Sequence, residues 1–379
     1  MKAAYIAYIH IPFCEHICYY CDFNKFFLQG QPVDEYLQSL FQEFKMTFDP
    51  TATKELETIF VGGGTPTALN ERQLEILCKG IRENLPFTKG EFTFEANPGD
   101  LTKEKLKILA HYGVNRLSFG VQSFNNDLLE KIGRSHRVQD VYRSIEQAQE
   151  LGFENISIDL IYALPQQTLA DFRDTLQKAL ELNLPHYSGY SLIVEPKTIF
   201  YNLMRKGKLP LPSEDEEADM YRVLMEEMEK KGLQQYEISN FSRPGYESKH
   251  NLIYWNNEEY YGFGAGAHGY INGVRYSNAG PLKKYMEPIS EGERPVFTEN
   301  SPTKKEMLEE EMFLGLRKIK GVSVSHFQNK FTLDPYQVFQ PAIKNMTERG
   351  LLEIQHDHIR LTEKGRFLGN EVFQAFLLS

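Results

Sequence analysis

Cys14-Glu-His-Ile-Cys18-Tyr-Tyr-Cys21 contains three of the four cysteines of this 379-residue chain. Thiolates spaced this closely on one loop are typical of iron–sulfur clusters, and three of them leave one iron of a [4Fe–4S] cube open. A zinc site would need a fourth Cys or His to complete a tetrahedron, and His10 and His16 are nearby in sequence. The spacing favours the cluster over zinc.

Short β-rich runs alternate with helical patterns around and after this loop, which predicts an α/β fold with a parallel sheet. The predicted strands are Tyr5–Ile9, Thr58–Val61, Phe92–Glu95, Arg116–Val121, Ile156–Ile161 and Tyr187–Leu192. The predicted helices are Glu35–Phe44, Glu71–Asn84, Lys103–His111, Val138–Leu151 and Leu169–Leu182. Six such repeats predict an open sheet or a partial barrel of six βα units.

The pattern changes after a helix predicted at Ala218–Lys231, so we expect a first domain at residues 1–230. Residues 231–300 form an irregular segment rich in Gly, Tyr and Asn. Residues 301–379 are predicted to contain two helices (Lys305–Arg317 and Pro335–Arg349), a hairpin within 350–362 and a last helix. Helices followed by a small hairpin suggest a winged-helix-like C-terminal domain.

Composition and charge exclude several classes of protein. Hydrophobic residues make up 41% of the chain and charged residues 25%, as in ordinary globular proteins. The formal net charge is −10, and residues 301–379 contain 11 Lys and Arg against 10 Asp and Glu, so no basic surface predicts nucleic-acid binding. No signal peptide or membrane-spanning run is evident. The chain has few cysteines, and three of them are spaced as metal ligands, which indicates a reducing compartment. We therefore expect a cytoplasmic protein.

Gly62-Gly63-Gly64-Thr65-Pro66-Thr67 directly follows a predicted strand. Glycines allow the backbone to approach a ligand closely and to adopt positive φ angles. An ordinary βα turn is the alternative interpretation, but the triple glycine favours a ligand.

Three later strands alternate apolar and polar residues, which directs one face to the surrounding helices and the other to the barrel lumen. The polar residues are Thr93 and Glu95, Ser118 and Gln122, and Ser157 and Asp159. In each pair the last residue is near the C-terminal end of its strand, where βα proteins place their sites. Cys78, in contrast, falls within the apolar stripe of a predicted helix and is expected to be a core residue.

With Tyr8-Ile-His-Ile-Pro-Phe13 ahead of it, the cysteine motif resembles that of the radical S-adenosylmethionine (SAM) superfamily, in particular its porphyrin-related branch. The resemblance covers most of the chain. It implies a partial (βα)6 barrel and a [4Fe–4S] cluster held by Cys14, Cys18 and Cys21, with SAM on the open iron.

The same resemblance implies the residues that bind SAM. The glycine segment, with Gly63, Gly64 and Thr65, would meet the amino group of SAM, and Glu95, Gln122 and Asp159 would form hydrogen bonds with its polar groups. Arg134 would contact the carboxylate of SAM. Tyr8 and Tyr20 are also expected to contact cofactors. From the residues alone, Arg134 could equally be a surface arginine.

His250-Asn-Leu-Ile-Tyr-Trp255 contains the only tryptophan of the chain. This HNxxYW pattern resembles the hallmark of the heme chaperones called HemW, which are relatives of the oxygen-independent coproporphyrinogen III dehydrogenase. The resemblance implies heme binding, with His250 as a candidate iron ligand. The alternative is a histidine satisfied by hydrogen bonds inside an aromatic core.

Two departures from the dehydrogenase pattern favour the chaperone. Phe23 occupies the position of that enzyme's fourth cysteine, and only 13 residues precede Cys14. We therefore expect a protein that binds heme, passes it to acceptors such as membrane-associated respiratory proteins, and does not oxidise coproporphyrinogen III. No catalytic residue is assigned, and a homodimer remains open. The alternatives are a radical SAM enzyme acting on a porphyrinogen propionate and a DNA-binding regulator with an iron–sulfur sensor, which the charge disfavours.

Overall fold

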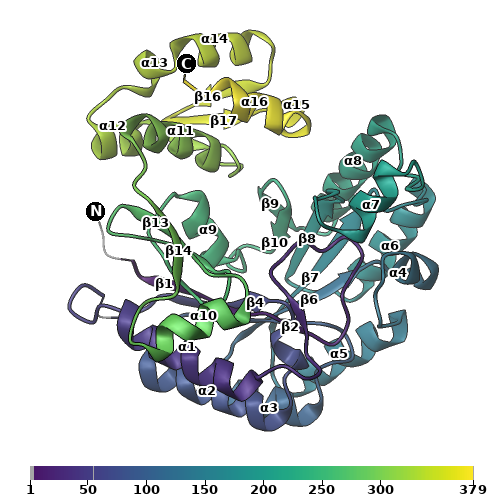
Figure 1. Cartoon of the computed structure of the whole chain (residues 1–379). Helices are drawn as coiled ribbons and strands as arrows, with labels where there is room; N and C mark the ends of the chain where they lie inside the picture. The colour runs from purple at the N-terminus through teal and green to yellow at the C-terminus, as the bar shows by residue number, and fades with distance from the viewer. Residues whose placement is uncertain (1–3, 54, 379) are drawn as a thin grey trace.

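Six parallel strands with helices between them form the larger part of the molecule (Figure 1). The computed structural model describes residues 4–53 and 55–378, so the outermost residues of the first and last predicted domains, and residue 54, lie outside the described residues. The strands are β1 (Ile6–Ile11), β4 (Thr58–Gly63), β5 (Glu91–Ala96), β6 (Arg116–Gln122), β7 (Asn155–Tyr162) and β8 (His186–Ser191). The partial (βα)6 barrel is confirmed.

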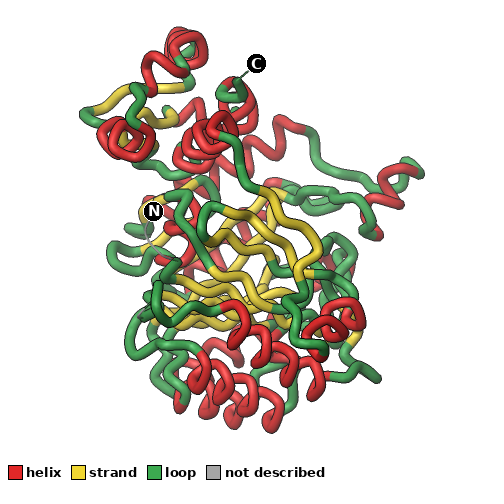
Figure 2. Tube along the Cα trace, turned by 60° about the vertical axis from the view of Figure 1, so that its left-hand side comes forward, coloured by secondary structure: helices red, strands yellow, loops and turns green. Residues whose placement is uncertain are grey.

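The helices between these strands cover the outer side of the sheet (Figure 2). They are α1 (Val33–Thr47), α2 (Glu71–Asn84), α3 (Lys103–His111), α4 (Asn126–Lys131), α5 (Val138–Glu150) and α6 (Leu169–Glu181). Both α2 and α3 have the predicted bounds, because the side chains of Asn70 and Thr102 cap their first turns. Cys78 on α2 is fully buried in the apolar core, as predicted.

Three short strands extend the barrel sheet at its two edges. β11 (Tyr261–Phe263) pairs parallel to β1, while β10 (Asn240–Ser242) and β9 (Gln234–Glu237) add antiparallel strands beyond β8. A separate sheet contains β12 (His268–Ile271), β13 (Val274–Asn278) and β14 (Val296–Asn300). Residues 231–300 are therefore more ordered than the sequence indicated. Their strands were not predicted because strands of three to five residues are too short to show a clear period.

The C-terminal domain surrounds a second apolar core, and its hairpin of β16 (Leu352–Gln355) and β17 (His358–Leu361) pairs with β15 (Val322–Ser323). The helices of this domain are α11 (Lys304–Gly315), α12 (Val324–Phe331), α13 (Pro335–Val338), α14 (Gln340–Glu348), α15 (Glu363–Phe367) and α16 (Gly369–Ala375). The winged-helix-like arrangement is confirmed, with two differences. Helix α12 was not predicted, and the predicted helix Pro335–Arg349 is divided at Phe339, because Pro341 lacks a backbone N–H and starts a new helix.

The remaining elements lie in the loops of the barrel and in the segments that follow it. They are β2 (Phe13–Cys14), β3 (Phe26–Phe27), the 3-10 turn η1 (Pro66–Ala68), α7 (Ile199–Arg205), α8 (Glu214–Lys230), α9 (Lys249–Trp255) and α10 (Leu282–Ser290). Helix α9 contacts both parts of the molecule: it packs on β4, and Arg317 of the C-terminal domain lies 4.5 Å from the ring of Trp255. No helix in the described part of the chain is both long and apolar enough to cross a membrane.

Candidate functional site

The three cysteines predicted to hold the cluster line one cavity of about 310 Å³, which we call the cluster pocket. Cys14 is buried in β2, while Cys18 and Cys21 are half-buried in the loop that follows. Burial raises the pKa of the Cys14 thiol to about 11 and also raises that of Cys21. Thiols in such a place ionise readily only when a cation is present, so the donor set fits an iron cluster that binds thiolates.

The glycine segment at the end of β4 forms one wall of the cluster pocket. A Cβ atom on Gly64 would lie 2.7 Å from the carbonyl oxygen of Phe13 and 3.0 Å from the Cys14 sulfur, so a side chain does not fit there. Gly63 has φ +117° and donates its N–H to Glu95 Oε2 at 3.1 Å. The glycines therefore allow the backbone to approach both the thiols and the lumen.

Glu95 and Asp159 project from β5 and β7 into the same pocket. Burial, with a further contribution from the charge of Asp159, raises the pKa of Glu95 to about 8. Burial also raises the pKa of Asp159 above its ordinary value. A ligand with positive charge, such as the amine and sulfonium of SAM, would favour the ionised forms of both carboxyls. The polar lumen face predicted from strand alternation is thus present.

Gln122 and Arg134 also line the cluster pocket, and each has a buried polar atom without a hydrogen-bond partner among the described residues. These atoms are Oε1 of Gln122 and Nε of Arg134. Gln122 adopts φ +69° at a register shift in β6, a backbone conformation that few side chains other than glycine adopt. Unpaired buried polar atoms are uncommon, and those beside a cavity are consistent with a polar ligand.

Arg134 connects several parts of the cluster pocket. Its Nη1 donates to the Cys18 sulfur at 3.3 Å, and its Nη2 donates to Asn97 Oδ1 at 2.6 Å and to the backbone carbonyl of Gly120. Asn97 in turn donates to Thr65 Oγ1 at 3.0 Å. Asn97 was not predicted from the sequence, although its position directly after β5 was a signal that could have identified it.

The remaining predicted cofactor residue near the cysteines, Tyr20, also lines the cluster pocket. Tyr8 does not, because it lies on β1 in a second cavity. In the described residues, no three His, Cys, Asp or Glu side chains converge closely enough to share a single metal ion.

The second cavity has a volume of about 500 Å³, and we call it the aromatic pocket. Its lining includes Tyr8 on β1, Phe60 on β4 and Tyr254 on α9, together with the histidines His10, His250 and His268. Tyr8 and Phe60 are register partners with stacked rings 6.2 Å apart. Phe23 lines both cavities, so the two pockets adjoin at this residue.

His250 lines the aromatic pocket, and only 1% of its surface is exposed. Its Nδ1 is 2.6 Å from Thr58 Oγ1 and its Nε2 is 2.9 Å from the Tyr254 hydroxyl. Burial lowers the pKa of its imidazole to about 3, so the ring is neutral. The role of His250 as an iron ligand stays a prediction, and it would require one of these hydrogen bonds to break.

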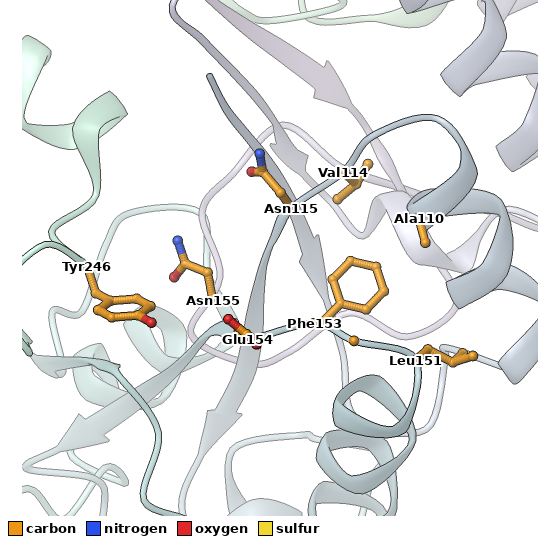
Figure 3. Close-up of a pocket in the computed structure, with 9 residues that line it drawn as sticks. Ala110, Val114, Asn115, Leu151, Phe153, Glu154, Asn155 and Tyr246 are labelled. Atoms are coloured by element: carbon orange, nitrogen blue, oxygen red, sulfur yellow. The ribbon is translucent and has the colours of Figure 1, made fainter. Parts of the chain in front are cut away.

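A third hollow, of about 320 Å³, lies at the opposite, N-terminal end of the sheet (Figure 3). Val114, Phe153, Asn155 and Tyr246 are among the residues that line it, and its lining includes no Cys or His. In βα barrels this end contributes to stability, whereas sites lie at the other end. We assign no function to this hollow.

Two family models match the chain. The model of the radical SAM superfamily matches residues 8–179, which include the cysteine motif and the lumen residues up to Asp159. The model of the HemN C-terminal domain matches residues 303–368.

Curated relatives match the chain over nearly its full length. The heme chaperone HemW of Bacillus subtilis (strain 168) is 56% identical, over 98% of both chains. The protein of the same name from Escherichia coli (strain K12) is 33% identical, over 98% of this chain and 97% of the relative.

Among solved structures, the coproporphyrinogen III oxidase HemN of Escherichia coli, described as a radical SAM enzyme, superposes with a TM-score of 0.87. It is 27% identical in sequence, and the match covers 99% of this chain and 90% of the enzyme. The fold therefore extends over both the barrel and the C-terminal domain.

Proposed function

Because the chain belongs to the HemW family within the radical SAM superfamily, we propose that it is a heme chaperone, which binds heme and passes it to acceptor proteins. The observation that carries the proposal is the presence of two adjoining cavities, one containing three thiols and the other lined by aromatic rings and histidines. A chaperone on this scaffold needs a place for its cargo that is separate from its own cofactors.

We propose that Cys14, Cys18 and Cys21 hold a [4Fe–4S] cluster with one open iron, which would supply a binding position for SAM. The residues around this position would then do the work of recognition. Glu95 and Asp159 would accept hydrogen bonds from the amine and the ribose of SAM, and Arg134 would pair with its carboxylate. The glycine segment with Gly63, Gly64 and Thr65 would allow close approach of the amino group, and Gln122 and Tyr20 would complete the wall.

Heme is a flat, largely apolar molecule with an iron at its centre, and aromatic side chains pack well on its faces. The aromatic pocket offers Tyr8, Phe60 and Tyr254 for such packing, and it contains imidazoles, which are common ligands of heme iron. Phe23, where the enzyme family has a fourth cysteine, adds another ring at the boundary with the cluster pocket. These features support cargo binding over oxidation of a porphyrinogen.

We further propose that the protein acts in the cytoplasm and that its acceptors include membrane-associated respiratory proteins. Heme-loaded protein should restore a cytochrome spectrum when it is incubated with membranes from heme-depleted cells. Addition of the same amount of free hemin is the control, because a chaperone should transfer heme faster than uncatalysed uptake.

The proposal is tested with anaerobically reconstituted protein supplied with SAM, reductant, hemin and coproporphyrinogen III. We expect about one heme per chain, since the chain has a single HNxxYW segment, and no loss of carboxyl groups from the porphyrinogen. Decarboxylation with matching consumption of SAM would show that the chain is a porphyrinogen-oxidising enzyme.

A further inference from the structure

We propose that heme occupies the aromatic pocket and that His268, not His250, supplies the ligand to its iron. This inference rests on the proposed function and names its binding site. The pocket volume of about 500 Å³ lies within the ~300–1,000 Å³ that is usual for small-molecule sites. Its walls are formed mainly by rings, with Tyr8 and Phe60 stacked on one side and Tyr254 and Tyr260 packed edge to face, 4.7 Å apart.

The three histidines of the pocket differ in whether their ring nitrogens are free. His10 is buried, and its Nε2 lies 2.8 Å from the carbonyl oxygen of Asn24, which can only accept, so this nitrogen carries the proton. Its Nδ1 lies 2.9 Å from the Tyr8 hydroxyl. Both nitrogens of His250 are also engaged. Neither ring can bind iron without losing a buried hydrogen bond.

His268 is exposed, and its ring takes part in none of the hydrogen bonds found among the described residues. It is the first residue of β12, and it lines the pocket together with Gly266 and Ala267. An imidazole that is accessible to solvent and keeps a free nitrogen can bind iron without a prior rearrangement. Among the three histidines, His268 alone combines access with a free nitrogen.

Hydrogen bonds hold the backbone that leads to His268, whereas the His268 ring forms none among the described residues. Gly264 donates its N–H to Glu43 at 2.8 Å, and Ala265 donates its N–H to the Tyr36 hydroxyl at 3.1 Å. Asn24 donates to the carbonyl oxygens of Ala265 and Gly280 at 2.8 and 3.0 Å. A ligand on a rigid support needs little ordering when the metal binds. Because Asn24 follows Cys21 by three residues, the same loop supports the cluster pocket and the approach to His268.

Phe23 separates the proposed heme position from the cluster pocket. This residue is 63% exposed, although it lines both cavities. An exposed aromatic ring at the boundary of a cavity gains burial when a flat apolar ligand covers it. We therefore expect Phe23 to pack against one edge of the bound heme.

The test is a titration of the full chain, cluster-reconstituted under anaerobic conditions, with hemin. The His268→Ala variant should lose the Soret band of the wild-type complex and bind hemin at least ~10-fold more weakly, since even loss of second-shell support costs metal sites ~10- to 100-fold. Added imidazole should restore the band. His111→Ala, at an exposed histidine at the end of α3, is the matched control and should bind hemin normally.

A His268→Cys variant tests the identity of the ligand directly. If residue 268 contacts the iron, a thiolate there should give the red-shifted ferrous carbonyl band of thiolate-ligated heme. The amount of cluster per chain is measured in every variant, and an unchanged amount shows that the barrel is intact.

A wild-type Soret band in His268→Ala, with no thiolate signature in His268→Cys, would overturn the assignment of His268. Loss of the band in His250→Gln, with normal cluster content, would then identify His250 as the ligand and leave the proposed function standing. A wild-type protein that binds no hemin would refute the proposed function itself.

Discussion

The cluster pocket and the aromatic pocket adjoin at Phe23, yet they are lined by different chemistry. The cluster pocket combines thiols, glycines and two buried carboxyls at the C-terminal ends of the strands. The aromatic pocket follows the inner face of β1 and β4 towards α9 and contains tyrosines, phenylalanines and histidines. The first is suited to a charged cofactor on a metal cluster, and the second to a flat apolar ligand with a metal at its centre.

The two pockets differ because different positions along the same strands line them. Tyr8 and Phe60 point into the lumen from β1 and β4, the same strands whose ends lead to Cys14 and Gly63. The barrel lumen is therefore divided: polar residues occupy the β5–β7 side, and rings occupy the β1–β4 side. Under the proposed function, one barrel would hold a cofactor and a cargo at the same time.

The largest expected effect is the loss of the iron–sulfur cluster, which we assign to the cluster pocket alone. Cys14→Ser, Cys18→Ser or Cys21→Ser should abolish the [4Fe–4S] cluster, because each removes one of three thiolates that hold it. Iron content and the EPR signal of the reduced protein measure this loss. Cys78→Ser is the matched control, since Cys78 is on the buried face of α2 and lines neither pocket. Loss of the cluster in the Cys78 variant would contradict the assignment.

The second effect concerns the support of the aromatic pocket and depends on pH. Glu43 is buried, and its carboxylate accepts hydrogen bonds from Gly264, Asn278 and Tyr285. Burial raises its pKa to about 7 from an ordinary value of 4.5. As the pH rises, Glu43 therefore keeps its proton to a higher pH in the folded state than in the unfolded state. The stability that this protonation contributes is complete below about pH 4.5 and is lost as the pH rises through about 7.

Such a shift corresponds to on the order of 3 kcal/mol. Glu43→Gln cannot titrate, so the difference in unfolding free energy between wild type and variant should change by this amount across that pH range. Chemical denaturation at a series of pH values measures it. A difference that does not vary with pH would show that Glu43 stays ionised in the folded protein.

The third expected effect is a loss of SAM affinity without a change in hemin binding. Asp159→Ala should weaken SAM binding by ~1–3 kcal/mol, about 5- to 150-fold, because a buried hydrogen-bonding partner is removed. Isothermal titration of cluster-containing protein measures the affinity, and hemin binding should not change. Asp174→Ala, at an exposed carboxylate on α6, is the control. Equal SAM affinity in wild type and Asp159→Ala would refute the role of the lumen carboxyls.

The smallest expected effect is a loss of stability at the N-terminus of α9. Glu91 accepts hydrogen bonds from the backbone N–H groups of Lys249 and His250, at 2.9 and 3.1 Å, and from Ser248. Glu91→Gln keeps one acceptor oxygen but loses the charge at the helix N-terminus, which should cost about 1 kcal/mol of stability. Denaturant unfolding measures this cost, and Glu71→Gln on the exposed surface of α2 is the comparison. Equal stability of wild type and Glu91→Gln would show that the charge of Glu91 does not stabilise the N-terminus of α9.

Much of the cluster pocket could be predicted from the sequence, because its residues follow local rules. Cysteine spacing, a glycine run after a strand and period-two alternation each depend on neighbours in the chain. Glu95 and Asp159 were therefore predicted from the strand pattern alone. Arg134 required the family resemblance, since its contact with Cys18 joins residues 116 positions apart.

The aromatic pocket was less predictable, because its parts come from distant segments. His268 follows a glycine-rich turn, and the sequence does not show that this turn is tied to Asn24 or that it faces Tyr8. The HNxxYW motif drew attention to His250, whose nitrogens are already engaged. Trp255 of the same motif packs against Arg317, a contact between domains that no local pattern indicates.

If both proposals hold, one chain binds SAM and heme in separate pockets. The most direct measurement is a SAM titration of cluster-reconstituted protein, performed with and without saturating hemin. We predict the same SAM dissociation constant in both titrations and a complex that contains both ligands. If hemin and SAM exclude each other, so that no complex contains both ligands, they share one site, and the assignment of two separate pockets is contradicted.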